Sequence, residues 1–449
     1  MKKNSFGTLV FVLLGIAALM ASIYTLSTKE IIPRMLIFCG AMAAVALASL
    51  IAARYLRKDL GDTIAASLLA AIAALYAVEY YLVKFPPQAQ KITYSTNHDT
   101  RSMREVIADL RQSGNSGVVP IIYPSAILTS PDIFSGRSLN LEGRQILPLS
   151  GISSRPTVLC NESGYWAKYD SDEMGFHNPK GLWKQVVDIA VVGDSFSHGN
   201  CVHSGEDWVS IVRKRFPHTL NLGMGGNGPL YELATIKEYL TTLKPKIVIW
   251  EYFEANDSRI TAELTLPILN RYLNEPDFKQ DIKLQQAEID KYLKQLVENA
   301  LKVAAVSQLD KFNLSSFLRL INLRSILGLQ LESSTRTQDV LSQALAEGNR
   351  VVSSWGGRLY FVYLPSAVGL TSQNKHFYTS RETVISLANK QNIPVIDLYP
   401  KFASSKDPLS YFPYRGVLHY NAEGYKLVAE EVTEQISRYS DAIPMQVLR

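Results

Sequence analysis

The chain has 449 residues, a formal net charge of +5 and 47% hydrophobic residues. This length exceeds that of a typical single domain, so more than one domain is expected. The charge is modest and comes without a long basic run, which argues against nucleic acid as a partner. The hydrophobic residues are concentrated near the N-terminus, and this uneven distribution indicates the class of protein.

Three apolar stretches lie within residues 1–85 and have no polar face: Phe6–Leu26, Ile31–Ile51 and Thr63–Val83. Each has roughly the 20 residues that a helix needs to cross a bilayer. A cleaved signal peptide explains the first stretch less well, because its apolar run is too long and two more follow directly. A buried core helix is disfavoured because the polar face is missing. The sequence therefore predicts a region of three transmembrane helices over residues 1–85.

The basic residues near these stretches predict how the chain is oriented. Cytoplasmic ends of membrane helices are enriched in lysine and arginine. Five basic residues lie on one side of the predicted membrane and three on the other: Lys2, Lys3, Arg54, Arg57 and Lys58 against Lys29, Arg34 and Lys84. We therefore expect a multi-pass protein of the inner (cytoplasmic) membrane, with everything after Lys84 on the periplasmic or extracytoplasmic side. Glu79 is expected near the outer interface, where it can reach water.

Two of the three cysteines, Cys160 and Cys201, lie in the part predicted to be exported. Disulfides persist in such compartments. The two cysteines flank an apolar strand-like run, Val187–Val192. A metal site would need more ligands at closer spacing, so the sequence favours a Cys160–Cys201 disulfide.

Residues 86–186 read as a linker and a strand-and-loop lead-in to the main domain. Pro86 and Pro87 break the third apolar helix. An amphipathic helix is predicted over Arg101–Gln112 and a strand over Val118–Tyr123, and the chain is then rich in turns up to Trp183.

From residue 187 to 449, strands and helices alternate, which predicts a parallel sheet with helices on both faces. An insertion over residues 260–337 is helical and charged; a solvated helical excursion and a cap over the catalytic edge are both compatible with it. The predicted strands are Val187–Val192, Thr219–Leu222, Lys246–Tyr252, Arg358–Leu364 and Pro394–Leu398, and the predicted helices are Asp207–Arg215, Leu230–Thr242, Gln338–Ser354, Arg381–Gln391 and Asn421–Tyr439.

A small hydroxyl group follows the first of these strands, in the sequence Gly193-Asp194-Ser195. In open α/β sheets, ligands bind at the carboxyl ends of the strands. A serine on a tight turn at this edge is a candidate nucleophile. The tripeptide alone is also ordinary turn chemistry.

Three later segments could assist such a nucleophile. The glycine-rich turn over residues 221–228 can point backbone N–H groups at an oxyanion, and it lacks the spacing and lysine of a phosphate-binding P-loop. Asn256 follows the third strand and can donate a further hydrogen bond, although a helix N-cap is the simpler interpretation. His419 precedes the last helix and is a candidate general base.

These segments together resemble the SGNH (GDSL-type) hydrolase and esterase family, over roughly Asp188–Ser440. The resemblance implies a three-layer α/β/α, flavodoxin-like domain with a five-stranded parallel sheet, and it implies no cofactor and no metal. It assigns Ser195 as the nucleophile and first oxyanion donor, and His419 as the base. It also assigns Gly226, with Gly223 and Gly225 close by, and Asn256 to the oxyanion hole.

Two positions depart from the family pattern. Glu254 stands where the third motif usually begins with glycine. Gly416 and Val417 occupy the positions of the aspartate in the two usual forms of the last motif, Asp-x-x-His and Asp-x-His. His419 therefore lacks the usual carboxylate, which predicts a Ser–His dyad oriented by a backbone carbonyl and slower than a full triad.

Three other histidines, His177, His198 and His203, lie near the nucleophile in sequence. Their spacing matches no metal-ligand motif, so we expect loop or substrate-contact residues.

The sequence thus predicts a membrane-anchored serine esterase or O-acyltransferase of the cell envelope. Its substrate would be an acylated, above all acetylated, cell-envelope or extracellular glycan. A transferase would need a membrane partner that delivers acyl groups. The alternative is a catalytically degenerate SGNH module that binds glycan or scaffolds an envelope polysaccharide complex.

Overall fold

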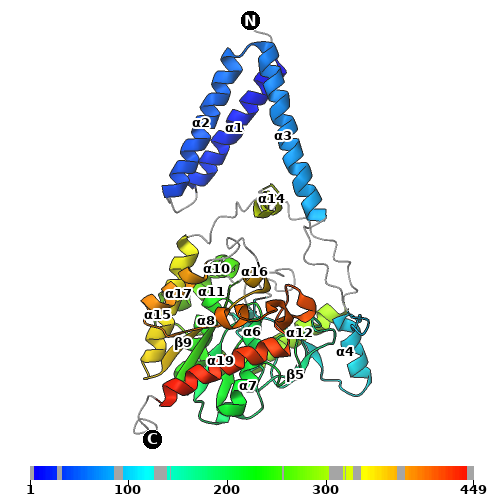
Figure 1. Ribbon diagram of the computed structural model, residues 1–449, viewed down its shortest axis with the longest axis vertical. Helices are drawn as coiled ribbons and strands as arrows, with labels where there is room; N and C mark the ends of the chain where they lie inside the picture. Colours follow the sequence, from blue (N-terminus) through cyan, green and yellow to red (C-terminus); the bar gives the residue numbers. More distant parts are fainter. Residues whose placement is uncertain are drawn as a thin grey trace. The chain divides into compact units, whose positions relative to one another are not determined.

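A computed structural model describes residues 5–27, 33–84, 95–125, 139–141, 143–254, 257–302, 317–318, 320–326, 335–371 and 380–441. The chain forms two compact units (Figure 1). The first comprises Met1–Pro87 and Lys311–Leu329, and the second comprises Gln88–Asp310 and Gln330–Arg449.

Helices form at all three apolar stretches of the first unit: α1 (Phe6–Ser27), α2 (Pro33–Tyr55) and α3 (Lys58–Lys84). Among the described residues, one helix, α3, is long and apolar enough to cross a membrane by length and composition. The described apolar helical stretches Phe6–Met20 and Ala43–Tyr55 are shorter. Three membrane spans therefore stay a prediction.

A short helix, α14 (Ile321–Ile326), begins against α3 within the same unit. Glu79 on α3 accepts hydrogen bonds from the backbone N–H groups of Asn322 (3.0 Å) and Leu323 (2.7 Å), and also from the Asn322 amide. The first N–H groups of a helix lack intrahelical partners, and a carboxylate satisfies them well. Glu79 is fully buried by this contact, so the expectation that it reaches water was wrong.

The second unit contains the predicted five-stranded, all-parallel sheet, in the order β10-β9-β8-β6-β7. The first strand of this sheet along the chain, β6, lies between the next two, β7 and β8. This order creates a topological switch point at the carboxyl end of β6, where flavodoxin-like sheets bind ligands. The strands are β6 (Ile189–Val192), β7 (Thr219–Asn221), β8 (Ile247–Phe253), β9 (Arg358–Leu364) and β10 (Val395–Asp397).

Helices cover both faces of this sheet, as the alternation of strands and helices predicts (Figure 1). Alternate residues of β6 point to opposite faces: Ile189 and Val191 join the core under α7 (Trp208–Arg215) and α19 (Ala422–Asp441). Ala190 and Val192 join the core on the other face. That second core is completed by α8 (Pro229–Thr235), α15 (Thr335–Ser353) and α17 (Arg381–Lys390). The expected three-layer α/β/α architecture is therefore present.

The lead-in contributes to the same core rather than to a separate one. Leu147, Phe176 and Trp183 are buried with the residues of α8 and α15. Buried Asp172 organises the chain here by accepting hydrogen bonds from four groups, among them the Trp183 indole N–H (2.7 Å), and burial raises its pKa to about 6. The lead-in elements are α4 (Met103–Gln112), β1 (Val119–Pro120), β2 (Leu139–Leu141), β3 (Arg144–Ile146), β4 (Pro156–Val158) and β5 (Lys168–Asp170).

The part of the insertion up to residue 302 packs into the second unit. The side chains of Ile289, Leu293 and Val297 on α12 (Gln286–Lys302) are buried in the core. Asp290 on the same helix accepts hydrogen bonds from the backbone and hydroxyl of Ser153 in the lead-in. A solvated excursion therefore does not describe this part.

The other helical segments are α10 (Asp257–Glu263), α11 (Pro267–Asn274), α9 (Thr241–Leu243), α16 (Ala367–Thr371), α18 (Tyr399–Ala403), a π-helical turn (Ile236–Leu240) and 3₁₀ turns at Leu182–Lys184, Ile282–Gln285, Pro408–Tyr411 and Pro413–Arg415.

Candidate active site

The serine of the Gly-Asp-Ser motif is the first residue of a one-turn helix, α6 (Ser195–His198), directly after β6. Asp194 caps this helix, because its carboxylate accepts a hydrogen bond from the Phe196 N–H at 2.8 Å. The Ser195 N–H lies in the first turn, where helical N–H groups have no intrahelical partner. Its assignment as an oxyanion donor stays a prediction.

The buried carboxyl group of Glu251 supports the turn that carries Ser195. Glu251 on β8 accepts hydrogen bonds from the Asp194 N–H (3.1 Å) and the Ser197 hydroxyl (2.9 Å). Burial, with the nearby charges of Asp194 and Glu232, raises the pKa of Glu251 well above its usual value. A Cβ at Gly193 would lie 2.4 Å from the Glu251 Oε2 atom, which explains why glycine precedes Asp194.

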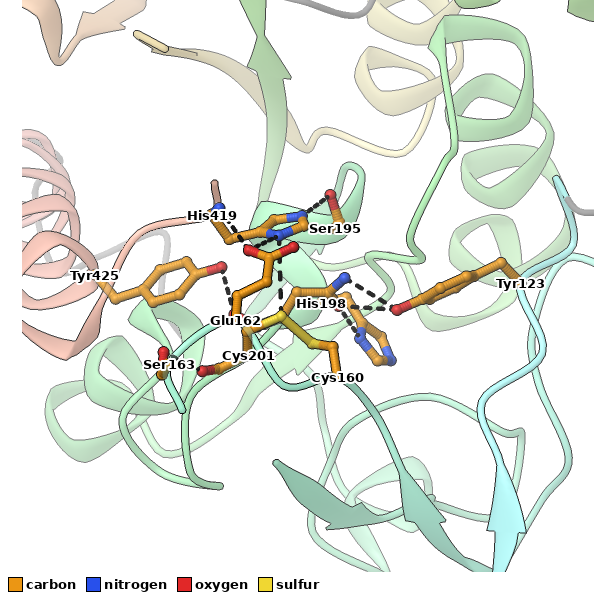
Figure 2. Close-up of a disulfide and its surroundings, with 10 residues drawn as sticks. Tyr123, Cys160, Glu162, Ser163, Ser195, His198, Cys201, His419 and Tyr425 are labelled. Carbon is orange, nitrogen blue, oxygen red and sulfur yellow. Dashed lines mark hydrogen bonds and ion pairs between the residues drawn. A yellow bond between two sulfur atoms is a disulfide. The ribbon is translucent and has the colours of Figure 1, made fainter. Parts of the chain in front are cut away.

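His419 reaches the nucleophile from the loop before α19. Its Nε2 atom lies 2.8 Å from Ser195 Oγ (Figure 2). The Phe196 ring packs beside the imidazole, with ring centroids 4.9 Å apart. The structure therefore brings together the two residues that the sequence assigns as nucleophile and base, although they are 224 positions apart.

The carboxylate that the last motif lacks comes from the lead-in. Glu162, in the turn between β4 and β5, places Oε2 2.8 Å from His419 Nδ1 and 2.8 Å from the His419 backbone nitrogen. This contact assigns the proton to Nδ1 and leaves Nε2 to accept from Ser195. The structure therefore differs from the expected Ser–His dyad: it holds a Ser–His–Glu arrangement, with no carboxylate supplied from Gly416.

Charge and hydrogen bonding favour the ionised form of Glu162. Burial alone would raise its pKa, but the attraction to His419 and the two hydrogen bonds from that residue outweigh burial and lower the pKa below its usual value. An ionised carboxylate beside Nδ1 is what stabilises an imidazolium during acyl transfer.

The expected disulfide joins Cys160 to Cys201, with Cα atoms 5.1 Å apart (Figure 2). Cys160 lies two residues before Glu162, and Cys201 lies six residues after Ser195. The Ser163 hydroxyl also donates to the Cys201 carbonyl at 2.7 Å. The bond therefore connects the turn that carries the carboxylate to the loop that follows the nucleophile.

One group of potential metal ligands occurs among the described residues: Glu162, Cys201 and His419, whose donor atoms lie within 4.8 Å of one another. The Cys201 sulfur is bonded to Cys160, and His419 Nδ1 is hydrogen-bonded to Glu162. The chemistry of these donors fits a hydrogen-bonded triad better than a metal centre, because neither the sulfur nor Nδ1 is free to coordinate an ion.

The glycine-rich turn after β7 packs against the nucleophile helix. A Cβ at Gly223 would lie 2.5 Å from the Ser197 Cβ, so only glycine permits this approach. Gly226 adopts a left-handed conformation (φ +82°), and its carbonyl accepts a hydrogen bond from Arg259 on α10 at 3.0 Å. Asn256 lies outside the described residues, so its assignment to the oxyanion hole stays a prediction.

Glu254, which replaces the usual glycine of the third motif, ties two strand ends together. Its buried carboxylate accepts hydrogen bonds from the Tyr363 hydroxyl (2.5 Å), from the Ser366 N–H (2.7 Å) and from the Ser366 hydroxyl. These contacts connect the end of β8 to the loop after β9, which lines the site. The departure at this position is therefore structural.

None of the three histidines His177, His198 and His203 is hydrogen-bonded to Ser195. His198 is fully buried and bonded to the Tyr169 hydroxyl (3.2 Å) and Asn200 (3.0 Å), and burial lowers its pKa to about 3. His177 bonds the His198 carbonyl at 2.9 Å. His203 stacks on Tyr165, with ring centroids 4.0 Å apart. The environment of each is structural, and the expected substrate contacts stay untested.

A small pocket of about 210 Å³ opens at the Ser195–His419 pair. Phe196, Phe253 and Val417 provide its apolar wall, and Arg259 and Ser366 provide polar groups. Arg259 on α10 borders this pocket one residue before the insertion begins, and no described residue of the insertion lines it, so the cap interpretation stays untested. A larger cavity, of about 910 Å³, lies between α7 and the lead-in and includes neither Ser195 nor His419.

Ser195, His419 and Glu162 form a continuous hydrogen-bonded chain at the carboxyl end of β6. Residues 191–427 match the family model of the GDSL-like Lipase/Acylhydrolase family, more than half of the chain. The chain therefore belongs to this family.

Among solved structures, the chain is similar to the lipase/acylhydrolase from Enterococcus faecalis: 16% identity, TM-score 0.32, covering 56% of this chain and 95% of that one. It is also similar to a two-domain esterase (CEX) active on acetylated mannans: 14% identity, TM-score 0.32, covering 56% of this chain and 49% of that one. An acetyl xylan esterase, AlAXEase, has 11% identity and TM-score 0.32, covering 55% of this chain and 99% of that one. No curated protein matches the sequence.

Proposed function

We propose that this protein is a membrane-anchored serine esterase or O-acyltransferase of the cell envelope, which acts on acetyl esters of a glycan. The observation that carries the proposal is the continuous hydrogen-bonded chain Ser195–His419–Glu162, with both heavy-atom distances at 2.8 Å. Nucleophile, base and orienting carboxylate lie within hydrogen-bond reach of one another, which is the geometry that this chemistry requires.

In the proposed mechanism, Ser195 Oγ attacks the ester carbonyl while its proton moves to His419 Nε2. Glu162 stabilises the imidazolium that forms. The oxyanion accepts hydrogen bonds from the Ser195 N–H, and Gly226 and Asn256 are the proposed further donors. His419 then returns the proton to the departing sugar oxygen, which leaves an acyl-serine. Water or a second sugar hydroxyl, deprotonated by His419, removes the acyl group and regenerates Ser195.

The size of the pocket supports a short acyl group. Its volume of about 210 Å³ is smaller than the roughly 300–1,000 Å³ of sites that enclose drug-sized ligands. Stacked Phe196 and Phe253, with centroids 4.1 Å apart, form part of its apolar wall. An acetyl group suits this space better than a long fatty chain, while the sugar would extend out of the pocket.

The N-terminal helices support membrane attachment. The length and apolar composition of α3 suit a membrane span, and the sequence adds two further apolar stretches. The basic-residue asymmetry places the hydrolase on the extracytoplasmic side in this proposal, next to the bilayer and to envelope glycans. If the second substrate is a sugar hydroxyl, a membrane partner would have to deliver the acyl group.

The alternative, a degenerate glycan-binding or scaffolding module, depended on the missing aspartate. Glu162 weakens that argument, because it occupies the position relative to His419 that the aspartate would take. An intact hydrogen-bonded triad has no need to persist in a module that only binds.

The test uses the full chain in detergent with p-nitrophenyl acetate and a fluorophosphonate probe. We expect hydrolysis, and labelling that disappears in Ser195→Ala but persists in Ser204→Ala, a serine on a neighbouring loop. Adding oligosaccharide acceptors and measuring the masses of the products by mass spectrometry distinguishes hydrolysis from acyl transfer. Hydrolysis and labelling that both survive Ser195→Ala would contradict the proposal.

A further inference from the structure

The carboxylate of the triad lies on a segment that is outside the hydrolase sheet. Glu162 belongs to the turn between β4 and β5 of the small lead-in sheet, and residues 161–166 of this turn are half-buried. Ser195 and His419, in contrast, lie next to β6 and α19, which form the core of the domain. The position of Glu162 relative to His419 therefore depends on how the turn is attached.

Besides the stack of Tyr165 on His203, two contacts attach this turn to the nucleophile loop, and both end on Cys201. One is the disulfide from Cys160, and the other is the 2.7 Å hydrogen bond from the Ser163 hydroxyl to the Cys201 carbonyl. These contacts lie immediately before and after Glu162 in sequence. Cys201 Sγ itself lies 4.0 Å from His419 Nδ1, so the bond is adjacent to the atom that Glu162 must meet.

The turn is also held on its other side, to the lead-in. The Asn161 side-chain amide donates to the Asp99 carbonyl at 2.5 Å, and the Ala167 N–H donates to the Cys160 carbonyl at 2.8 Å. These contacts do not involve the disulfide. Opening the disulfide would thus leave these contacts of the turn in place while removing its covalent attachment to the nucleophile loop.

The backbone at Cys201 adds a second observation. Cys201 is fully buried and has φ +67°, in the left-handed region that residues other than glycine rarely adopt. Such conformations cost energy and persist where the surroundings over-determine them, often at functional sites. At Cys201, the disulfide and the hydrogen bond from Ser163 both belong to these surroundings.

We propose that the Cys160–Cys201 disulfide is a positioning element for catalysis, which holds Glu162 Oε2 against His419 Nδ1; this rests on the proposed triad. Catalysis depends steeply on such placement, since a displacement of about 1 Å can cost about 10²-fold in rate. The triad is therefore complete only when the bond is closed, as it is in an oxidising compartment. The cysteines touch no reacting atom and act through Glu162.

A double-mutant cycle on the full chain tests this. The Cys160→Ser/Cys201→Ser pair is made in the natural chain and in a Glu162→Gln background, and kcat and KM for p-nitrophenyl acetate are measured for all four proteins. In the natural background we expect a loss of kcat of about 10- to 10²-fold with little change in KM. In the Glu162→Gln background the same pair should change kcat less than about twofold, because residues that act as a unit are not additive.

A matched control distinguishes the positioning effect from a general loss of stability. Val432→Ala removes buried side-chain volume in α19, within the core under the sheet and away from the disulfide. At a temperature where both proteins are folded, we expect Val432→Ala to keep its kcat and the cysteine pair to lose it. Equal loss in both, or a cysteine effect of the same size in both backgrounds of the cycle, would overturn the positioning role.

Failure of the underlying function has a different signature. If Ser195→Ala retains full activity, the proposed active site is wrong whatever the cysteines do. If Ser195→Ala is inactive and the cysteine pair is fully active with Glu162 present, only the positioning proposal fails.

Discussion

The sheet edge that carries Ser195 and His419 and the lead-in turn that carries Glu162 are built in different ways. The edge belongs to a strand whose residues are all buried, with helices packed on both faces. The turn is half-buried and is attached by a disulfide and a few hydrogen bonds. The comparison teaches that elements of the buried core position the nucleophile and the base. The orienting carboxylate needs only to be held within hydrogen-bond distance of the base. Any segment that can be held there can supply it.

The strongest test of the sheet edge is removal of the base. His419→Ala should lower kcat for p-nitrophenyl acetate by about 10⁴-fold or more, because loss of one member of such a unit removes nearly all of its catalysis. Circular dichroism would verify the fold. A loss below tenfold would mean that another group accepts the Ser195 proton.

The next test addresses the lead-in turn. Glu162→Gln keeps the size of the side chain but removes the charge beside His419 Nδ1, and we expect kcat to fall by about 10²- to 10⁴-fold. Glu206→Gln, on a glutamate of the neighbouring loop that bonds the His203 N–H, is the matched control and should change little. If the two variants behave alike, the turn does not contribute to catalysis, and the Ser–His dyad expected from the sequence is sufficient.

A smaller effect is expected at Gly416, the position where the family motif carries its aspartate. From sequence alone, Gly416→Asp would restore a triad and raise the rate. The structure overturns that expectation, because Glu162 already accepts the Nδ1–H of His419. In the natural background the substitution should leave kcat unchanged or lower it. A clear rise in kcat would show that Glu162 does not serve His419.

These tests address both residues that the sequence predicts and a residue that it does not predict. The five strands and the candidate roles of Ser195 and His419 follow from local patterns: apolar runs, helical periodicity, and motifs placed directly after strands. The flavodoxin-like arrangement of the strands follows from the family resemblance. Glu162 has no such pattern, since it is a single glutamate in a turn, 257 residues from its partner. The sequence analysis did not identify it, and the one signal that could have done so is indirect: a predicted disulfide with one cysteine two residues away and the other in the nucleophile loop.

His198 and His419 both lie at the nucleophile helix, but their different positions in the fold give them different chemistry. His198 lies in the helix itself, fully buried against Tyr169 and Asn200, with no carboxylate bonded to it, and its pKa is lowered to about 3. His198→Gln should therefore change kcat only a few-fold, far less than His419→Ala does. A loss as large as that of His419→Ala would make His198 the base.

The same burial gives a stability effect whose sign can be worked out. The unfolded chain protonates this histidine near its ordinary pKa of about 6.5, while the folded chain keeps it neutral down to about 3. The unfolded state thus binds more protons between these values, and His198 lowers stability as pH falls through that window. Between pH 7 and pH 4 this loss is about 3 kcal/mol for one such group. Urea unfolding at both pH values should show that His198→Gln, although less stable at pH 7, loses less stability on acidification than the natural chain. Parallel losses in the two proteins would mean that His198 is not the neutral, buried group that its surroundings require.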